Sequence, residues 1–368
     1  MVETNFFSLT IRLGWKCNGK CSYCSVGKFL NQEAETLKIN DDIYNYIVRW
    51  SKSASPDNVK GLGFYGGEPL LYFETIKSII HRLESDKDFN RDCVRYRIVT
   101  NGVLLNEEIV DFCNKNSILV TLSYDAPLID GLRDVHISDV QIPLFLSLKY
   151  RQVQFVYNAV NARPLISKLF LEKKFPGTQV RCSVYANYTD SLKPEFSCFN
   201  RVELLMGLDE LLRYYKDKMP DLVFHRIFSA AKRIGRFDLD KFNNGQIQCI
   251  AGRGIALDLQ GNIYMCANCG EKTADIYDGD YKLIRSKCKQ DIVKRILPGC
   301  RKCPYLTICW VYCPLAYVTG NQYEFCDYHK VLYDFVYRHQ QEIMRIFERG
   351  NYDISKGYAL HAFMQGKD

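Results

Sequence analysis

Apolar and polar residues alternate in several short segments of the first half of the chain, and segments with apolar residues three and four positions apart separate most of them. A period of two predicts a β-strand, and the three-to-four spacing predicts an amphipathic helix. The predicted strands span residues 6–13, 59–65, 94–99, 118–122, 153–160 and 179–185. Strands that alternate with helices predict βα units around a parallel sheet. Six such units favour an α/β fold with an open, partial (β/α)6 barrel of the TIM type over a closed barrel of eight.

The second half changes to a helical segment and then to a cysteine-rich one. From Asn200 onwards leucines recur at helical spacing, which indicates core packing, and we interpret residues 200–248 as a helical bridge. Residues 255–259 and 263–266 flank Gln260-Gly261-Asn262, which predicts a β-hairpin with glycine in its turn. The predicted organisation is a barrel over 1–199, the bridge over 200–248, a cysteine-rich domain over 249–330, and a closing helix with a tail over 331–368.

The composition is that of a globular protein and favours a cytoplasmic location. Of 368 residues, 47% are hydrophobic and 25% are charged, and no apolar run is long enough to cross a bilayer. The first residues lack a secretion signal, so we expect the sixteen cysteines to stay reduced and to indicate metal ligation more than disulfides. The formal charge of +7 weakly favours an acidic partner such as a peptide, although an ordinary solvated surface explains it better. Without a dense Lys/Arg run we expect no nucleic-acid partner, and we expect no membrane partner.

Three cysteines follow the first predicted strand in a short loop with the spacing Cys17-x3-Cys21-x2-Cys24. Cysteine thiolates are the usual ligands of iron–sulfur clusters, and three thiolates leave one iron of a 4Fe–4S cluster open to a small molecule. Gly19 allows the loop to turn tightly, because glycine tolerates positive φ. The spacing alone leaves a zinc site and unligated core thiols as alternatives.

Glycines and polar residues follow the ends of the second, third and fourth predicted strands. They are Gly66-Gly67-Glu68-Pro69, Thr100-Asn101, and Ser123 with Asp125. Ligands bind at the carboxyl ends of strands in α/β sheets and barrels, so we expect these residues to share one site. The glycines would let a ligand approach the backbone, Glu68 would accept hydrogen bonds from an ammonium group, and the others would bond a ribose or a carboxylate. Taken singly, each is also typical of an ordinary turn or cap.

A second set of cysteines occupies the region after residue 248. Cys249 precedes the predicted hairpin and Cys266 ends it, with Gly261 between them. Further along, the chain has the spacing Cys300-x2-Cys303-x5-Cys309-x3-Cys313, followed by Cys326. The run from 300 to 313 alone would suit a zinc site, whereas the complete pattern with the hairpin glycine is far more specific.

Together these motifs resemble those of the radical S-adenosylmethionine (SAM) enzymes that carry a SPASM domain for auxiliary iron–sulfur clusters. The resemblance rests on the three-cysteine loop with Tyr23, on the GGEP sequence at 66–69, on Thr100-Asn101-Gly102, on the serine and aspartate at 123 and 125, and on the C-terminal cysteines. It implies a cluster whose open iron binds SAM, and an electron from the cluster that cleaves SAM to a 5′-deoxyadenosyl radical. That radical abstracts a hydrogen atom from the substrate.

The resemblance also implies roles for single residues. The sequence Gly66-Gly67-Glu68-Pro69 would bind the SAM amino group, Ser123 and Asp125 would lie near the ribose, and Tyr23 beside the adenine. Relatives often have Asp-Gly after the serine, whereas this chain has Asp125-Ala126, which puts the backbone there in question.

For the C-terminal cysteines the resemblance implies two auxiliary clusters, expected to be of the 4Fe–4S type. The ligands of the distal cluster would be Cys300, Cys303, Cys309 and Cys326. The ligands of the proximal cluster would be Cys249, Cys266 and Cys313, with a fourth position that is open or filled by Cys269 or Cys288. Cys269 is also a candidate catalytic residue, as a hydrogen-atom donor near the substrate, and an inert thiol is the alternative.

Within this family we favour an oxidoreductase-like enzyme that modifies a peptide by a cross-link or an oxidation, as in the maturation of ribosomally made peptides, with flavodoxin or ferredoxin as reductant. Sixteen residues precede Cys17, too few for a leader-recognition domain, so the peptide would need a separate recognition protein or direct binding to the barrel. The main alternative is a small-molecule enzyme of natural-product or cofactor biosynthesis. Ala267 stands where sulfatase-maturing enzymes carry a catalytic aspartate, which counts against formylglycine formation. An open iron counts against a non-catalytic electron carrier.

Overall fold

The computed structural model describes most of the chain, and the statements below concern the described stretches. They are residues 9–24, 26–31, 39–125, 133–156, 163–183, 200–240, 254–268, 270–309 and 322–349. Outside them lie Cys249, Cys269 and Cys313, the predicted segment ends at 6–8, 157–160 and 184–185, the bridge residues 241–248 and the tail from 350. Within the described stretches, no helix combines the length and the apolar character that crossing a membrane requires.

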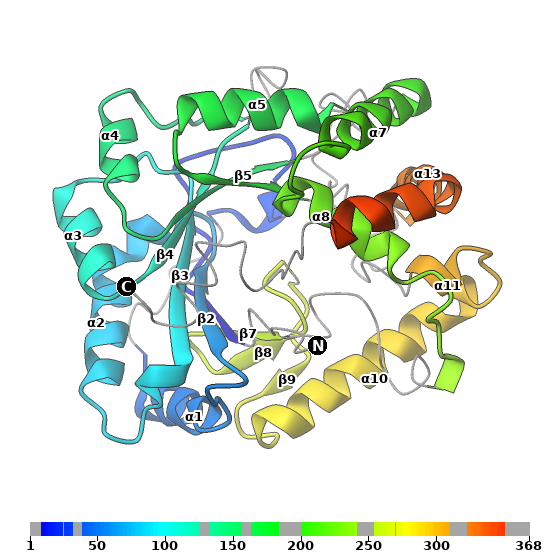
Figure 1. The fold of residues 1–368 in the computed structure, drawn as a ribbon. Coiled ribbons are helices and arrows are strands. Elements are labelled where there is room, and N and C mark those ends of the chain that lie inside the picture. The colour runs from blue at the N-terminus through cyan, green and yellow to red at the C-terminus, as the bar shows by residue number, and fades with distance from the viewer. Residues whose placement is uncertain are drawn as a thin grey trace.

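A sheet of nine strands organises the molecule, in the order β6-β5-β4-β3-β2-β1-β7-β8-β9 (Figure 1). The first six strands are β1 (Leu9–Arg12), β2 (Lys60–Tyr65), β3 (Val94–Thr100), β4 (Leu119–Ser123), β5 (Arg151–Val156) and β6 (Gln179–Ser183). Neighbours among these six pair in parallel. The predicted βα units and the open, partial barrel are confirmed.

Five helices cover the outer side of the curved sheet (Figure 1). They are α1 (Asp41–Ser51), α2 (Phe73–Glu84), α3 (Glu107–Lys115), α4 (Gln141–Leu146) and α5 (Pro164–Lys174). Asn40 and Asn106 precede α1 and α3, and each side-chain oxygen accepts a backbone N–H of the first turn at 2.9 Å. Such N-caps satisfy amide groups that have no partner inside the helix. Short 3₁₀ helices occupy η1 (Gly27–Phe29), η2 (Pro69–Tyr72) and η3 (Arg91–Cys93).

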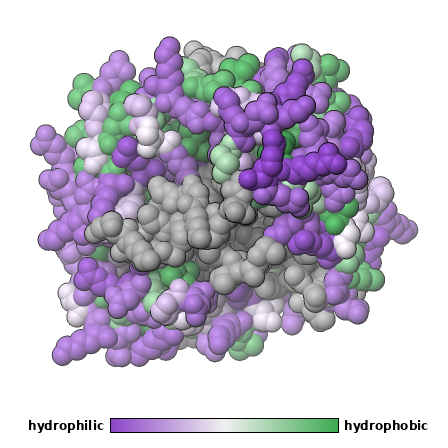
Figure 2. All heavy atoms as spheres, in the orientation of Figure 1, coloured by the Kyte–Doolittle hydropathy of each residue, from purple (hydrophilic) through white to green (hydrophobic). Residues whose placement is uncertain are grey.

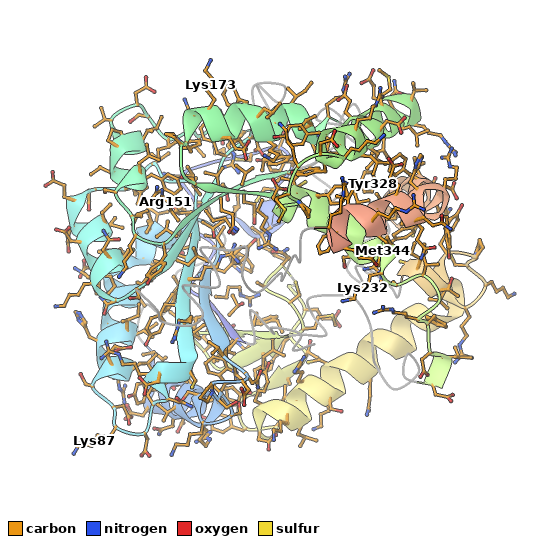
Figure 3. The ribbon with its side chains drawn as sticks, in the orientation of Figure 1. Lys87, Arg151, Lys173, Lys232, Tyr328 and Met344 are labelled. Carbon is orange, nitrogen blue, oxygen red and sulfur yellow. The ribbon has the colours of Figure 1, made fainter. Side chains whose placement is uncertain are left out.

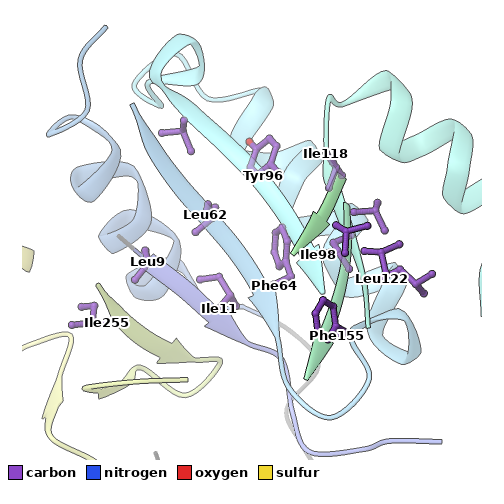
Figure 4. Close-up of a cluster of buried hydrophobic side chains, with 14 of the residues drawn as sticks. Leu9, Ile11, Leu62, Phe64, Tyr96, Ile98, Ile118, Leu122, Phe155 and Ile255 are labelled. Carbon is purple, nitrogen blue, oxygen red and sulfur yellow. The ribbon is translucent and has the colours of Figure 1, made fainter. Parts of the chain in front are cut away.

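The two faces of the sheet differ in polarity. The outer face, which packs against the helices, carries apolar side chains that are at most 1% exposed: Leu9, Ile11, Leu62, Phe64, Ile98, Leu122 and Phe155 (Figure 4). Successive side chains of a strand alternate between faces, so the intervening residues face the interior of the barrel. There, Arg97 Nε donates a hydrogen bond to Thr121 Oγ1 at 2.9 Å, and Gln152 is also buried. A polar interior differs from the packed apolar interior of a closed TIM barrel and suits a polar ligand.

The predicted hairpin extends this same sheet. β7 (Ile255–Asp258) pairs in parallel with β1, β8 (Asn262–Tyr264) returns antiparallel to β7, and β9 (Ala274–Asp275) adds one more antiparallel strand. Arg12 ties the strands together, because its guanidinium lies 3.5 Å from the centroid of the Tyr264 ring and 3.5 Å from Asp258 Oδ2. The hairpin is confirmed, but its place beside β1 depends on a pairing between distant segments that leaves no local sequence pattern.

Helices cover the open side of the barrel. The described part of the predicted bridge, residues 200–240, contains α7 (Arg201–Tyr215) and α8 (Leu222–Ala231), and α13 (Gln322–Glu348) packs against both. Tyr328 of α13 is buried and Met344 packs against the core (Figure 3). The closing helix begins at Gln322 and therefore includes Cys326, whereas the sequence pattern placed its start after that cysteine.

A long helix and a short one carry the cysteines between residues 281 and 309. They are α10 (Tyr281–Cys300) and α11 (Leu306–Cys309). The sequence pattern predicted no helix over residues 281–300. Tyr281, Ile284 and Cys288 recur at helical spacing and are buried, but the other apolar residues are spread around the helix and Pro298 lies near its end. Hydrophilic side chains cover much of the face shown in Figure 2, as expected for a globular chain with 25% charged residues.

Candidate functional site

The loop that follows β1 gathers three thiols. Cys17, Cys21 and Cys24 are each half-buried. Gly19 N donates to Cys17 Sγ at 3.4 Å, and Cys24 N donates to Cys21 O at 3.1 Å. Burial raises the pKa of each thiol, to about 11 for Cys21, and the charge of Cys24 adds to the rise at the other two. Cys24 therefore lies within electrostatic range of both Cys17 and Cys21.

Two glycines after β2 hold the start of this loop. A Cβ atom at Gly66 would lie 2.3 Å from the carbonyl oxygen of Gly14, and one at Gly67 would lie 2.2 Å from that of Lys16. Gly67 N donates to Gly14 O at 2.9 Å, and Glu68 N donates to Lys16 O at 2.8 Å. The sequence suggested a close approach of a ligand to these glycines, whereas the structure shows a close approach of the backbone that leads to Cys17.

Glu68 is the centre of a buried hydrogen-bond network. Its side-chain Oε1 accepts from Leu70 N at 3.0 Å and from Thr100 Oγ1 at 2.6 Å, and its Oε2 accepts from Asn101 N at 2.8 Å. Burial raises the pKa of Glu68, and these hydrogen bonds act against that rise. A carboxylate has about four acceptor positions, so Oε2 retains one for a further donor. The network leaves the residue able to accept one ligand hydrogen bond.

The ends of β3 and β4 reach the same region. Asn101 Nδ2 donates to Asn18 Oδ1 at 2.7 Å, which joins the end of β3 to the cysteine loop. Pro69 begins η2 and is buried. Ser123 is the half-buried last residue of β4 and stands opposite Gln154 in the sheet. The structure thus brings the predicted residues of β2, β3 and the cysteine loop into contact, with Ser123 at the same edge of the sheet.

Asp125 and Tyr23 meet around an arginine that the sequence did not single out. Tyr23 Oη donates to Asp125 Oδ2, and Arg133 Nε lies 3.0 Å from both of these oxygens. The other oxygen of Asp125 accepts from Val156 N at 2.9 Å. Burial lowers the pKa of Arg133, but the neighbouring Tyr23 and Asp125 raise it above its usual range, so the guanidinium stays charged. The roles of Tyr23 beside adenine and of Asp125 near ribose stay predictions.

Residues 133–135, which we call the clamp segment, lie against the cysteine loop. Asp134 accepts the backbone N–H of Lys20, and Val135 faces Gly19. The clamp segment follows residues 126–132, which lie outside the described stretches. Its role has no local sequence signal, because neither spacing nor periodicity connects these residues to a loop that precedes them by more than a hundred positions.

Cys266 lies close to the same edge of the sheet. It is half-buried two residues after the end of β8, and Asn268 N donates to its Sγ at 3.5 Å. Tyr65 Oη at the end of β2 donates to Asn268 Oδ1 at 2.8 Å. A Cβ at Gly270 would lie 2.2 Å from Cζ of Phe29, which follows the cysteine loop. The segment after Cys266 therefore reaches the end of β2 and the neighbourhood of the cysteine loop.

The four cysteines predicted for a distal cluster lie in or next to three helices, of which α11 and α13 pack against each other. They are Cys300 at the end of α10, Cys303 in the next turn, Cys309 at the end of α11, and Cys326 near the start of α13. Cys303 N donates to Cys300 O at 2.9 Å. The pKa of Lys330 is raised chiefly by its hydrogen bond to Asp327, and the charges of Cys326 and Cys303 add to the rise. Cys303 and Cys326 thus lie near one lysine.

The proximal set is described only in part. Cys249, Cys313 and the candidate catalytic residue Cys269 lie outside the described stretches. Cys288 is fully buried in the hydrophobic core, in the neighbourhood of Tyr46 and Tyr281. The environment of Cys288 is that of a core thiol.

The donor set of the cysteine loop fits an iron–sulfur cluster. As the side chains stand, no three His, Cys, Asp or Glu residues of the described stretches form a group that would hold a metal ion. Cys17, Cys21 and Cys24 nevertheless supply three thiols from one loop, and thiolate is the ligand that such clusters take. Glu68, which has one remaining acceptor position, is hydrogen-bonded through its backbone N–H to Lys16 O, next to Cys17.

The sequence is similar to a family model and to known proteins. Residues 12–136 match the model of the Radical SAM superfamily. A stretch of 123 residues is 32% identical to the radical SAM cyclopropyl synthase TigE of Paramaledivibacter caminithermalis, and covers 30% of this chain and 25% of that protein. Over 341 residues the chain is 24% identical to the cysteine-type anaerobic sulfatase-maturating enzyme of Clostridium perfringens. This alignment covers 80% of this chain and 84% of that enzyme. The match to TigE thus spans only a quarter of that protein's length.

Solved structures show the same fold. The chain resembles anSMEcpe with bound AdoMet and Kp18Cys peptide, with a TM-score of 0.67 at 19% identity over 94% of this chain and 99% of that one. It also resembles SuiB of Streptococcus suis bound to the precursor peptide SuiA, with a TM-score of 0.58 at 18% identity over 84% and 72% of the two chains. At these identities the likeness establishes the architecture.

Proposed function

We propose that this chain binds a 4Fe–4S cluster through Cys17, Cys21 and Cys24 and uses it to cleave SAM. The match of residues 12–136 to the model of the Radical SAM superfamily supports this proposal. When bound, the cluster and SAM supply a carbon-centred radical that abstracts hydrogen from an unactivated position. The observation that carries this proposal is the cysteine loop, which the backbone of Gly66 and Gly67 holds in place at the edge where Glu68 keeps a free acceptor position.

The residues around the loop divide the recognition of SAM among them. Glu68 Oε2 offers its remaining acceptor position to the ammonium group of SAM, since its other positions are taken by Leu70, Thr100 and Asn101. As the family resemblance implies, Ser123 and Asp125 would lie near the ribose of SAM and Tyr23 beside its adenine. Arg133 holds Asp125 and Tyr23 in place for that contact.

We infer that the substrate is a peptide that undergoes a cross-link or an oxidation. Two proteins of the same fold are described with bound peptides, a Kp18Cys peptide and a precursor peptide. The polar interior of the barrel, with Arg97, Thr121 and Gln152, suits a substrate that carries backbone amides or side-chain carboxylates. A flavodoxin or ferredoxin is the proposed reductant, and the peptide would bind through a separate leader-recognition protein or directly to the barrel.

We also propose that the C-terminal cysteines form a SPASM domain with two auxiliary clusters. The distal ligand set is Cys300, Cys303, Cys309 and Cys326, and the proximal set is Cys249, Cys266 and Cys313. The support is the cysteine spacing, together with the nearness of Cys303 and Cys326 to Lys330. The segment after Cys266 reaches Tyr65 at the end of β2, so a proximal cluster would lie on the side of the barrel where SAM is proposed to bind.

Formylglycine formation in a sulfatase is the second candidate. The similarity to a sulfatase-maturating enzyme over 84% of its length favours it. Against it stands Ala267, directly after Cys266, where that class carries an aspartate as base. A methyl group accepts no proton, so this chain would need another base for that reaction.

The proposed function is tested with anaerobically reconstituted protein, SAM and dithionite, and with 5′-deoxyadenosine as readout. Host-cell extract is divided by size into a peptide and a small-molecule fraction, and a synthetic cysteine peptide of a sulfatase forms a third arm. Stimulation by the peptide fraction alone supports a peptide maturase. Stimulation by the small-molecule fraction alone overturns the peptide assignment, and conversion of the sulfatase peptide supports the second candidate. Cys21→Ala is the control, and 5′-deoxyadenosine formed by this variant would overturn the assignment of the cluster loop.

A further inference from the structure

The clamp segment grips the cysteine loop at its middle. Both carboxylate oxygens of Asp134 accept the backbone N–H of Lys20, at 2.7 and 2.6 Å. Cys21 Sγ lies 3.5 Å from Asp134 Oδ1. A Cβ atom at Gly19 would lie 2.5 Å from Cγ2 of Val135, so only glycine allows the two segments to approach this closely. The clamp segment therefore determines where the loop between Cys17 and Cys21 lies.

Opposite charges from adjacent residues flank the same sulfur atoms. Arg133 is 8% exposed and is bound to Tyr23 and Asp125, while Asp134 touches the loop itself. The charges of Arg133 and Asp134 act on Cys21 and Cys24 with opposite signs, and the backbone of Asp134 also forms a hydrogen bond to Cys21 that favours its thiolate. Of these two side chains, that of Asp134 contacts a sulfur atom, the Sγ of Cys21.

We propose that Asp134 is a positioning residue that holds the cysteine loop, and that its negative charge beside the Cys21 sulfur lowers the reduction potential of the cluster bound there. The inference rests on the proposed function, because it concerns the cluster that Cys17, Cys21 and Cys24 would hold.

The physical argument follows from charge. A cysteine that ligates iron has lost its thiol proton, so the carboxylate of Asp134 then faces an anionic sulfur. Reduction transfers one electron to the cluster from a flavodoxin-type protein in the cell, or from dithionite in vitro, and thereby adds negative charge. A carboxylate at this distance disfavours that added charge, and the potentials of iron–sulfur clusters respond to local charge and to contacts at the sulfur atoms. A cluster that is harder to reduce is the stronger reductant once reduced, which favours the cleavage of a sulfonium.

The decisive variant is Asp134→Asn, which keeps a side-chain acceptor for Lys20 N–H and removes the charge. In anaerobic redox titrations followed by electron paramagnetic resonance, we expect the ratio of reduced to oxidised cluster at a fixed solution potential to rise about tenfold, which corresponds to a shift of about 59 mV for one electron. Asp139→Asn is the matched control, because Asp139 is an exposed carboxylate in the next turn of the chain. Its titration should coincide with that of the wild type.

The outcomes separate this inference from the proposed function. If the wild-type protein binds no cluster through Cys17, Cys21 and Cys24, the proposed function itself is wrong. If the wild type binds the cluster and cleaves SAM, but D134N titrates like D139N, the role of Asp134 is overturned. If D134N folds but takes up no cluster, Asp134→Ser, a neutral residue with one acceptor, is titrated in its place. Failure of both variants to bind a cluster would assign Asp134 to loop structure alone and overturn the redox inference.

Discussion

Replacement of Glu68 by glutamine tests the buried network that joins β2, β3 and the cysteine loop. The carboxylate accepts from Leu70 N and Thr100 Oγ1 through Oε1 and from Asn101 N through Oε2. Glutamine places an NH2 group at one of these two positions. At Oε2 it faces the Asn101 N–H, and at Oε1 it faces the Leu70 N–H, so either orientation sets a donor against a donor.

The magnitude follows from the cost of a buried amide without a partner. Glu68 is 2% exposed, so water does not replace the lost acceptor. Leaving one buried donor unsatisfied costs about 2 kcal/mol. Since about 1.4 kcal/mol corresponds to a factor of ten, we expect local opening around the affected amide to become about 30-fold more frequent.

The assay is amide hydrogen exchange followed by mass spectrometry on the anaerobic protein. We expect faster exchange, by about 30-fold, at Asn101 or at Leu70 in E68Q. Glu84→Gln is the matched control: its Oε1 can still accept from Tyr96 Oη at 2.7 Å, and the partner it loses, Arg91 Nε at 2.7 Å from Oε2, belongs to an exposed side chain that water can satisfy. Wild-type exchange at both Asn101 and Leu70 in E68Q would refute the network as described.

Two further predictions concern the loop and a buried lysine. Gly67→Ala places a Cβ 2.2 Å from Lys16 O and displaces the backbone before Cys17, so we expect loss of the SAM-perturbed cluster signal in electron paramagnetic resonance. Gly235→Ala is the control: its φ of +74° strains an alanine locally, but nothing lies within 4 Å of the new Cβ, so the signal should remain. A full signal in G67A would contradict the argument. Burial, with Arg285 and Lys282 nearby, lowers the pKa of Lys60 from 10.5 to about 8. Between about pH 8 and pH 10.5, Lys60 is protonated in the unfolded chain and largely neutral in the folded one. The unfolded state therefore binds more protons, and the free energy of unfolding gains a contribution that rises with pH across this interval. Lys60→Met should lose that contribution in urea unfolding measured across the interval, and an unchanged pH slope would refute it.

The strands and the outer helices of the barrel were predictable because their signals are local. Alternation along β2 and β3 and the side-chain caps at Asn40 and Asn106 depend on neighbours within a few residues. The same holds for the hairpin around Gly261, whose turn and flanking strands are adjacent in sequence. The helix α10 was missed, because only some of its apolar residues, the buried Tyr281, Ile284 and Cys288, keep a helical spacing.

The candidate site was predictable in its chemistry, though not in its contacts. Residue types and spacing were enough to select Cys17, Cys21, Cys24 and Glu68. The spacing did not reveal that the glycines at 66 and 67 serve the backbone before Cys17, because that contact joins two strand ends that only the sheet brings together.

By itself the sequence determined the alternation of strands and helices, the donor atoms of the cysteine loop and the family to which the motifs point, since each of these is encoded in residues close together in the chain. Only the tertiary structure decided that β7 extends the barrel sheet beside β1 and that Arg133 and Asp134 close on the cysteine loop. These contacts join residues far apart in sequence, and their free energy comes from burial, charge and hydrogen bonds that exist only once the sheet has formed. The residues that hold the loop are therefore the ones that no local pattern could name.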